Sequence, residues 1–349
     1  MPTPRRAAFA IGTSEIAAGT RQTVDLPFSV MSNHTPVTLP VHVIHGRRDG
    51  PVMFVSAAVH GDEVIGAEIV RRLLRTPALK TLRGTLLAVP IVNAFGLMNH
   101  SRYLPDRRDL NRSFPGSPRG SLASRLSHLF LTEVVARCDI GIDLHSAAVH
   151  RTNLPQVRVT PGNSRTLELA RIFAAPLTLT SKTRPGSLRH TAQERGVDIL
   201  LYEAGEALRF DETAVRAGVS GTLRIMRHLG MIAGKASSKR KNSTILSRDS
   251  SWVRSPEGGL LRIHKDIGAE VAEGDLLAVV SNPFGEHETT ITAERAGLII
   301  GRTKLPIVHE GDGLFHIATI AADISAEERI DDLVSELHSD ALMDEDELI

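Results

Sequence analysis

The sequence predicts an α/β protein in which helices cover both faces of a parallel or mixed β-sheet, followed by a small all-β module. Between residues 51 and 233, short apolar runs alternate with segments whose apolar residues recur at helical spacing. This alternation is typical of a sheet whose strands are joined by helices. After residue 250, short strands are separated by turns that contain glycine, which indicates a small β-domain.

The composition is that of a globular protein and excludes several other classes. The 349 residues allow two domains, or one large domain with an appendage, and 42% are hydrophobic. Lys and Arg number 41 and Asp and Glu 40, so the formal net charge of +1 argues against a dedicated nucleic-acid partner. The single cysteine, Cys138, excludes a disulfide framework, so a metal would take imidazole and carboxylate ligands.

Neither a secretion signal nor a membrane span is expected. The apolar stretch from Ala7 to Ile11 is too short for a secretory signal. No segment approaches the roughly 18 apolar residues that a transmembrane helix needs. We therefore expect a soluble, cytoplasmic protein without a membrane partner.

In chain order, residues 1–50 are predicted to be strand-rich and to belong to, or pack on, the main domain that spans residues 51–233. Strands are expected at 37–44, 52–59, 84–92, 140–144 and 197–202. Helices are expected at 64–74, 122–138, 167–173, 188–195 and 213–229.

The remaining chain divides into three further segments. Residues 234–250 are rich in Gly, Ser and Lys and are predicted to be a linker, in which Lys239, Arg240 and Lys241 are solvated rather than part of a nucleic-acid site. Residues 251–320 form the β module, with strands expected at 260–264, 276–280, 289–293, 298–301 and 314–318. Residues 321–349 are an acidic tail, expected to be a frayed helix or a disordered end.

The sequence His60-Gly61-Asp62-Glu63 follows the predicted strand 52–59. We expect His60 at the carboxyl end of that strand and Glu63 in the first turn of a helix capped by Gly61 or Asp62. His145 follows a second strand, 140–144. Because such strand ends meet at one edge of a sheet, the three side chains form a candidate His₂Glu metal site with room for a further ligand. The alternative is a hydrogen-bonded loop histidine and a glutamate that interacts with a helix dipole.

Three other groups of residues are candidates for the chemistry around a metal. Asp143, two residues before His145, is expected to orient a histidine or to be structural. Glu203 follows the strand 197–202 and suits a general base, although the residues alone do not separate it from Glu206. In the polar stretch 102–112, one arginine could stabilise the oxyanion that forms when water attacks a carbonyl, and a second arginine, with Asn, could bind a carboxylate. The alternative is that this stretch is a solvated basic loop.

In the same order along the chain, these residues resemble four motifs of the succinylglutamate desuccinylase/aspartoacylase family, relatives of the zinc carboxypeptidases. The resemblance covers about residues 35 to 320. The matching segments are His60-Gly61-Asp62-Glu63, Arg102 with Asp109-Leu110-Asn111-Arg112, Asp143-Leu144-His145 and Tyr202-Glu203-Ala204-Gly205. The last of these segments favours Glu203 over Glu206.

The resemblance implies a zinc-carboxypeptidase-like mixed sheet and a zinc-dependent deacylase that cleaves the amide bond of an N-acyl amino acid. It implies roles for seven residues: one Zn²⁺ per subunit bound by His60, Glu63 and His145; metal-bound water activated by Glu203; an oxyanion stabilised by Arg102; and a substrate carboxylate held by Asn111 and Arg112. The family often has further substrate contacts in an interval that here contains Arg158, Arg184 and Arg189. Fe²⁺, Co²⁺ or Mn²⁺ would suit the same ligands.

Residues 251–320 resemble a lipoyl/biotinyl-like barrel-sandwich domain, with the turn sequence 268–275 as its signature. Carriers of that type attach their cofactor to a lysine, and no lysine occurs between Lys265 and Lys304. We therefore expect this module to be structural or to shape the active site. Two other functions stay open, a metallocarboxypeptidase acting on peptides and a catalytically silent binding protein, as does assembly into a homo-oligomer.

Overall fold

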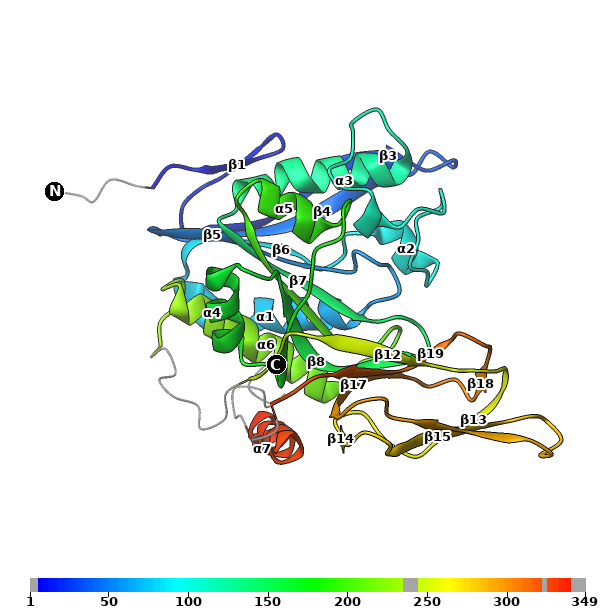
Figure 1. The fold of residues 1–349 in the computed structure, drawn as a ribbon. Coiled ribbons are helices and arrows are strands. Elements are labelled where there is room, and N and C mark those ends of the chain that lie inside the picture. The colour runs from blue at the N-terminus through cyan, green and yellow to red at the C-terminus, as the bar shows by residue number, and fades with distance from the viewer. Residues whose placement is uncertain (1–5, 235–243, 322–324, 340–349) are drawn as a thin grey trace.

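A computed structural model describes residues 6–234, 244–321 and 325–339 (Figure 1). Their strands form a 13-stranded sheet, a four-stranded sheet and a two-stranded ribbon. The strands are β1 (Phe9–Ile11), β2 (Ser14–Ile16), β3 (Thr20–Val30), β4 (Pro36–His45), β5 (Arg48–Ala57), β6 (Arg83–Val89), β7 (Ile140–Ala147), β8 (Arg151–Val159), β9 (Leu177–Thr180), β10 (Asp198–Glu206), β11 (Ile245–Ser247), β12 (Ser250–Arg254), β13 (Gly259–Ile263), β14 (Glu270–Val271), β15 (Leu276–Ser281), β16 (Glu288–Thr292), β17 (Gly297–Thr303), β18 (Ile307–Val308) and β19 (Gly313–Ala318).

The helices lie on both sides of the large sheet. They are α1 (Ile65–Arg75), α2 (Ala94–Met98), α3 (Leu122–Glu133), α4 (Ser164–Phe173), α5 (Leu188–Glu194), α6 (Glu212–His228) and α7 (Ala326–Ser339), with short 3₁₀ turns η1 (Pro77–Thr81), η2 (Leu110–Arg112) and η3 (Val135–Arg137). In Figure 1, α3 and α5 cover one face and α1, α4 and α6 the other. The α/β class, with helices flanking a mixed sheet, is confirmed.

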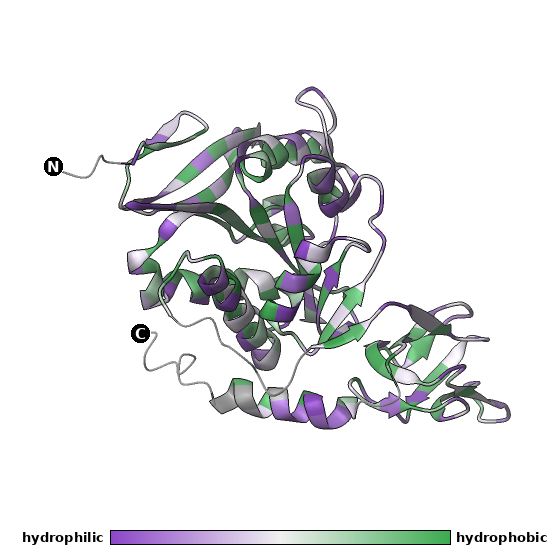
Figure 2. Ribbon diagram, turned by 60° about the vertical axis from the view of Figure 1, so that its left-hand side comes forward, coloured by the Kyte–Doolittle hydropathy of each residue, from purple (hydrophilic) through white to green (hydrophobic). Residues whose placement is uncertain are grey.

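Strands β6, β5, β7 and β10 are parallel neighbours at the centre of the large sheet, while β8 and β4 run antiparallel on either side of them. Parallel strands buried on both faces need near-continuous apolar sequence, and every residue of β7 is buried. Figure 2 shows the same pattern, with hydrophobic strands enclosed by helices. The carboxyl ends of β5, β7 and β10 therefore lie side by side at one edge, where a site was expected.

The β module and the main domain share a sheet. Strand β17 pairs with β8 through Gly301↔Asn153 and Thr303↔Arg151, and β19 and β12 continue the sheet beyond it. These strands face the four-stranded sheet of β13, β15, β16 and β18 across one apolar core, which gives a sandwich. Because β17 pairs with β8, the hydrogen-bonded sheet continues from one unit into the other and does not mark where a domain ends. The domain boundaries at 50, 233, 250 and 320 therefore stay predictions.

Several predicted segments have different bounds in the structure. Of the predicted linker, residues 235–243 with Lys239, Arg240 and Lys241 lie outside the described residues, whereas Ile245–Ser247 forms β11 and pairs with β9. In the acidic tail, α7 is a helix that packs against α6, and Leu337 is buried there. Residues 340–349 lie outside the described part. Strands β8 and β9 were not predicted from the sequence.

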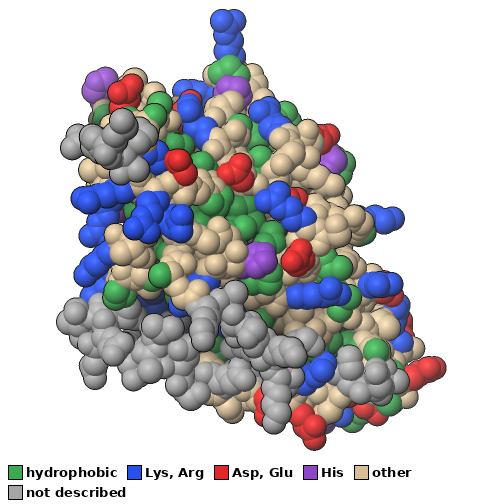
Figure 3. All heavy atoms as spheres, turned by 90° about the vertical axis from the view of Figure 1, so that its left-hand side faces the viewer, with side chains coloured by type: hydrophobic (Ala, Val, Ile, Leu, Met, Phe, Trp, Pro, Cys, Tyr) green, Lys and Arg blue, Asp and Glu red, His purple; other side chains and the backbone are tan. Residues whose placement is uncertain are grey.

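No helix in the described part of the chain is both long and apolar enough to cross a membrane. On the face shown in Figure 3, several Lys and Arg side chains gather near the left-hand edge, while others stand singly among Asp and Glu side chains.

Candidate active site

The loop between β5 and α1 carries the first two candidate ligands. Strand β5 ends at Ala57, and Ala58 turns the chain with a left-handed φ of 51°. His60 and Glu63 therefore both lie on the loop, rather than at a strand end and in a helical turn as predicted. The predicted cap is wrong, because Val64 is the N-cap of α1 and makes no side-chain cap bond.

Gly61 has a packing role instead of a capping one. A Cβ at this position would lie 2.0 Å from the backbone carbonyl carbon of Gly96 in α2. Only glycine permits the two backbones to come this close. The contact holds the loop in place on both sides of Gly61.

The structure brings His60, Glu63 and His145 together. Their ligand atoms lie within 4.8 Å of one another, and all three side chains are buried. The Nδ1 atoms of the two histidines lie 2.7 Å from the Oε1 and Oε2 atoms of Glu63, respectively. The backbone N–H of Ser146 also donates to Glu63 Oε2, at 3.2 Å.

Carboxylates hold the far side of each imidazole. Asp109 Oδ1 lies 3.1 Å from Nε2 of His60, and Asp143 Oδ2 lies 2.7 Å from Nε2 of His145. Asp143 is itself fixed by the hydroxyl of Ser56, which donates to Oδ1 at 2.7 Å. Ligating histidines usually donate their second ring N–H to such a carboxylate, so both rings offer Nδ1 as the ligand atom.

Neighbouring charges strongly shift the pKa values of Glu63 and His145. Burial alone would raise the pKa of Glu63, but the adjacent His60 and His145 outweigh it and hold this pKa well below its usual value. Burial alone would lower the pKa of His145, but Asp143 and Glu63 outweigh it and raise this pKa. The site therefore favours an ionised Glu63 next to a positive charge.

A divalent cation fits the donor set. If both imidazoles are neutral, the site carries three negative charges, on Glu63, Asp109 and Asp143. The guanidinium of Arg102 supplies one positive charge, so two negative charges stay uncompensated. Two imidazole nitrogens and one carboxylate are also ligand types of a catalytic zinc site.

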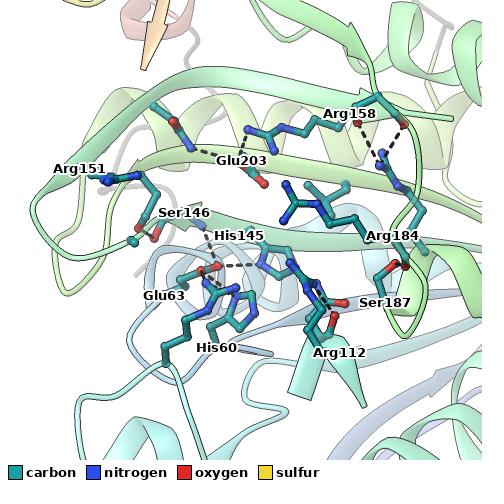
Figure 4. A pocket seen from close by; sticks show the side chains of 18 of the residues that line it. His60, Glu63, Arg112, His145, Ser146, Arg151, Arg158, Arg184, Ser187 and Glu203 are labelled. Atoms are coloured by element: carbon teal, nitrogen blue, oxygen red, sulfur yellow. Dashed lines mark hydrogen bonds and ion pairs between the residues drawn. The ribbon is translucent and has the colours of Figure 1, made fainter. Parts of the chain in front are cut away.

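Glu203 lies next to the candidate metal ligands. Strand β10 pairs with β7 in parallel, with Glu203 opposite His145, so both side chains leave the sheet on one face. Arg158 Nη2 and Asn153 Nδ2 bind Oε2 of Glu203 at 2.8 and 3.0 Å. Both contacts use the same oxygen, which leaves Oε1 to face the pocket (Figure 4). Glu206 is bound instead by Lys304 Nζ at 2.6 Å.

Arg102 comes from a different loop and is held beside the donor atoms of the candidate metal site. Its Nη2 donates to Asp109 Oδ2 at 2.9 Å, and its Nη1 donates to Glu63 Oε1 at 3.2 Å. Asp109 therefore links this arginine to the ring of His60, a role that the sequence did not reveal. The same aspartate accepts the N–H of Asn111 at 2.8 Å and so starts the turn that carries the next two candidates.

Asn111 and Arg112 border the pocket on another side. The N–H of Leu188 donates to Asn111 Oδ1 at 2.9 Å, so the amide NH₂ is the group left to bind a ligand. The guanidinium of Arg112 donates to the carbonyl of Asn111 at 2.6 Å. Burial, together with the nearby Arg184 and Arg102, lowers the pKa of Arg112.

All seven predicted site residues line one cavity of about 400 Å³, and Glu206 does not. Arg158, Arg184 and Arg189, whose direction the sequence left open, all line it as well. Of the lining side chains, seven are Lys or Arg and only Glu63 and Glu203 are acidic. The pocket is therefore built for an anionic ligand.

Sequence reasoning missed several residues that line or support the pocket. Asn153 and Arg151 lie on the unpredicted strand β8, and Trp252 reaches the pocket from the β module. Trp252 is the only tryptophan in the chain, which was an available but unspecific signal. Asp109 stood inside a motif interpreted only as a substrate contact.

The chain is similar in sequence to known proteins. The sequence profile of the Succinylglutamate desuccinylase/Aspartoacylase catalytic domain matches residues 49–229. The chain is 27% identical over 300 residues to the N-alpha-acetyl-L-2,4-diaminobutyric acid deacetylase of Halomonas elongata, a match that covers 82% of this chain and 87% of that protein. It is 28% identical over 195 residues to a succinylglutamate desuccinylase of Pseudomonas aeruginosa, covering 50% of this chain and 56% of that protein.

Solved structures share the architecture. The product-bound ectoine utilization protein EutE (DoeB) of Ruegeria pomeroyi superimposes with a TM-score of 0.77 at 25% identity, over 86% of this chain and 95% of that one. A succinylglutamate desuccinylase/aspartoacylase structure from Rhodobacter sphaeroides gives a TM-score of 0.77 at 25% identity, over 86% and 96% of the two chains. Both likenesses extend beyond residues 49–229 into the β module.

Proposed function

The chain belongs to the succinylglutamate desuccinylase/aspartoacylase family, and from this premise we propose that it is a metal-dependent hydrolase that removes the acyl group from an N-acyl amino acid. The observation that carries the proposal is the convergence of the His60, Glu63 and His145 donor atoms, Glu203 and a row of arginines on one cavity. The relatives named above act on acylated amino acids according to their names, which supports the same substrate class here.

We propose zinc as the ion, held by the Nδ1 atoms of His60 and His145 and by the carboxylate of Glu63. When bound there, the ion would polarise a carbonyl group and lower the pKa of water. Asp109 and Asp143 would keep the two rings in the required tautomer and orientation.

Glu203 is the proposed general base and acid. Because Arg158 and Asn153 hold Oε2, Oε1 is positioned to take a proton from the attacking water. The same carboxyl group then gives that proton to the amide nitrogen as the carbon–nitrogen bond breaks. The products are a free carboxylic acid and a free amine, so atoms and charge balance.

Arg102 is the proposed oxyanion partner. Its two bonds to Asp109 hold the guanidinium against the donor atoms, where negative charge develops on the carbonyl oxygen during attack. Asn111 and Arg112 are proposed to bind the carboxylate of the amino acid, with Arg184 close by. An amide and two guanidiniums provide enough donors for both carboxylate oxygens.

The decisive experiment compares Glu203→Gln with its matched control Glu206→Gln on the same strand. Metal-loaded protein is assayed with N-acetyl, N-succinyl and N-formyl amino acids, and metal content is measured by mass spectrometry. We expect Glu203→Gln to keep its metal and to lose at least about 100-fold in kcat, the usual range for a general base. Glu206→Gln should stay within about twofold of the wild type.

Two results would overturn the proposal. Near-normal turnover in Glu203→Gln would remove the assigned base. Hydrolysis of peptides, with none of the N-acyl amino acids cleaved, would identify a carboxypeptidase instead. The same metal analysis decides between zinc and Fe²⁺, Co²⁺ or Mn²⁺.

We also propose that the reaction takes place in the cytoplasm and that no nucleic acid takes part. Cys138, the only cysteine of the chain, is a free thiol, as is usual for proteins of a reducing compartment. Assembly into a homo-oligomer is a further proposal, which light scattering would test.

A further inference from the structure

The cavity extends to both sides of the metal-binding atoms. In Figure 4, Arg112 and Ser187 lie on one side of His145, and Arg151 lies on the opposite side, beyond Ser146. If Arg112 binds the carboxylate of the amino acid, as proposed above, the scissile carbonyl lies at the centre. The acyl group then points toward Arg151 and Trp252, which line the cavity together with Ala147 and Ala148.

Arg151 is a cation without a carboxylate partner among the described residues. Its guanidinium lies over the indole of Trp252, with Cζ 5.2 Å from the ring centroid, and no ion pair of the described part involves it. By contrast, Arg158 binds Glu203 and Arg102 binds Asp109. The positive charge at this end of the cavity is therefore available to a ligand.

The indole under Arg151 is held by further contacts. The ring of His316 stacks on the indole with a centroid distance of 4.7 Å and an interplanar angle of 7°. His316 is fixed in turn by Ser250, whose Oγ lies 2.9 Å from Nε2. A Cβ at Gly313 would lie 2.8 Å from Cε3 of the indole, so this glycine leaves the room that the ring occupies. Trp252, His316 and Gly313 all come from the β module.

We propose that Arg151, held on Trp252, binds a carboxylate at the far end of the acyl group. The substrate is then the half-amide of a dicarboxylic acid rather than a simple acetyl derivative, a refinement that rests on the proposed deacylase function. An acetyl group carries no charge that would use this guanidinium. A carboxylate in its place forms charge-assisted hydrogen bonds in a partly enclosed site, where such bonds are strong. The β module thus supplies the wall that selects the acyl group.

The test uses pairs of substrates that differ only in the terminal charge. N-succinyl and N-butanoyl amides have acyl chains of equal length, and each is made with glutamate and with alanine as the amine. We expect the wild-type enzyme to prefer succinyl over butanoyl in kcat/KM by about 10- to 100-fold. Arg151→Gln should reduce this ratio to near one for both amines, mainly through KM, whereas Arg151→Lys should keep part of it.

Two controls separate a specific contact from other effects. Lys182→Gln removes one positive charge from the same cavity, so an equal loss of the ratio in this variant would mean that only the overall field matters. Trp252→Phe keeps an aromatic platform and Trp252→Leu does not, so the first should retain the succinyl preference and the second should lose it.

The outcomes distinguish the Arg151 assignment from the deacylase proposal on which it rests. Hydrolysis of all four compounds with no succinyl preference refutes the Arg151 assignment and leaves the deacylase proposal intact. A change in the glutamate-to-alanine ratio instead of the acyl ratio also refutes it, because Arg151 would then face the amine. Hydrolysis of none of these four compounds, with N-acetyl or N-formyl amino acids still cleaved, also refutes the Arg151 assignment, whereas the deacylase proposal itself fails only if metal-loaded protein cleaves none of the N-acyl amino acids.

Discussion

Asp109 and Asp143 show how single residues at this site act through their neighbours. Each carboxylate holds one imidazole by Nε2, and each is fixed by a second contact, from Arg102 or Ser56. The rings therefore need no rearrangement to present Nδ1 to a cation. Two aspartates outside the proposed ligand set therefore support the candidate site.

We expect Asp143→Asn to weaken metal binding about 10- to 100-fold without unfolding the protein, because the amide holds the ring of His145 less firmly than a carboxylate does. Competition with a chelator of known affinity measures the change. Asp139→Asn is the control, since within the described residues the Asp139 side chain accepts only the backbone N–H of Val52, and Asp139 lies outside the cavity. Equal metal affinities in Asp143→Asn and the wild type would contradict the orienting role.

At this scale the sequence predicted which residue types meet, but not how they are held. His60, Glu63 and His145 were recognisable because they follow apolar strand-like runs that end at one sheet edge. The contacts of Asp109, Asn153 and Arg158 depend on χ angles and on loops that approach in three dimensions, and no spacing in the sequence encodes these. The residue pattern alone did not separate Glu203 from Glu206. The family resemblance favoured Glu203, and the register of β10 against β7 and the position of Lys304 support that choice.

Among the elements, strand β8 was missed for a physical reason. It carries polar residues on a buried face, including Asn153 and Gln156, and Pro155 lies in its middle. Buried amides and an internal proline both argue against a strand when only periodicity is considered. The structure accommodates the buried amide of Asn153 because it binds Glu203, so one of the features that hide the strand also serves the site.

The packing of β7 allows a stability prediction. A Cβ at Gly141 would lie 2.0 Å from the ring of Phe54, within the apolar core, so Gly141→Ala should lower the free energy of unfolding by about 1–3 kcal/mol. Gly258→Ala is the matched control, because its nearest atom would be 3.5 Å away, and it should change this free energy by less than about 0.5 kcal/mol. Denaturant unfolding of both variants checks the difference, and equal stabilities would contradict the assigned contact.

Strand β19 allows a prediction of pH dependence. Burial, and then the charge of Arg158, lower the pKa of His316 from 6.5 to about 3. The folded protein therefore holds this imidazole neutral while the unfolded chain protonates it below about pH 6.5. The contribution of His316 to stability is full above pH 6.5 and falls by up to about 1.4 kcal/mol per pH unit between pH 6.5 and 3.

His316→Phe keeps a ring beside Trp252 but cannot be protonated, so its unfolding free energy should depend less on pH in this window. Chelator-treated samples of both proteins are compared by denaturant unfolding from pH 7 to 4, so that loss of metal does not contribute. Parallel curves for the two proteins would show that His316 titrates normally.

At the scale of the whole molecule, the main domain and the β module share backbone hydrogen bonds as well as side-chain contacts. Strand β17 covers the edge of β8, and an apolar cluster spans residues of both units, among them Leu154, Leu177, Leu298 and Ile300. We therefore expect a single cooperative heat-unfolding transition in calorimetry. Two separated transitions would instead show that the β module unfolds as an independent domain.

The sequence predicted both units of the fold, because each has its own periodicity and composition. Their connection was beyond it, since pairing between β8 and β17 joins residues about 150 positions apart and leaves no local pattern. The short strand β11, within a segment whose composition resembles a linker, is defined in the same way by its partner β9.

The pairing of β8 with β17 also constrains how new specificities can arise in proteins of this architecture. Arg151 and Trp252 stand on opposite sides of that seam, so a crossover placed between the two units would inherit only half of the acyl-binding wall. Chimeras that exchange the module together with β8 should carry their donor's preference with them, while those that exchange the module alone should lose discrimination before they lose the catalytic centre.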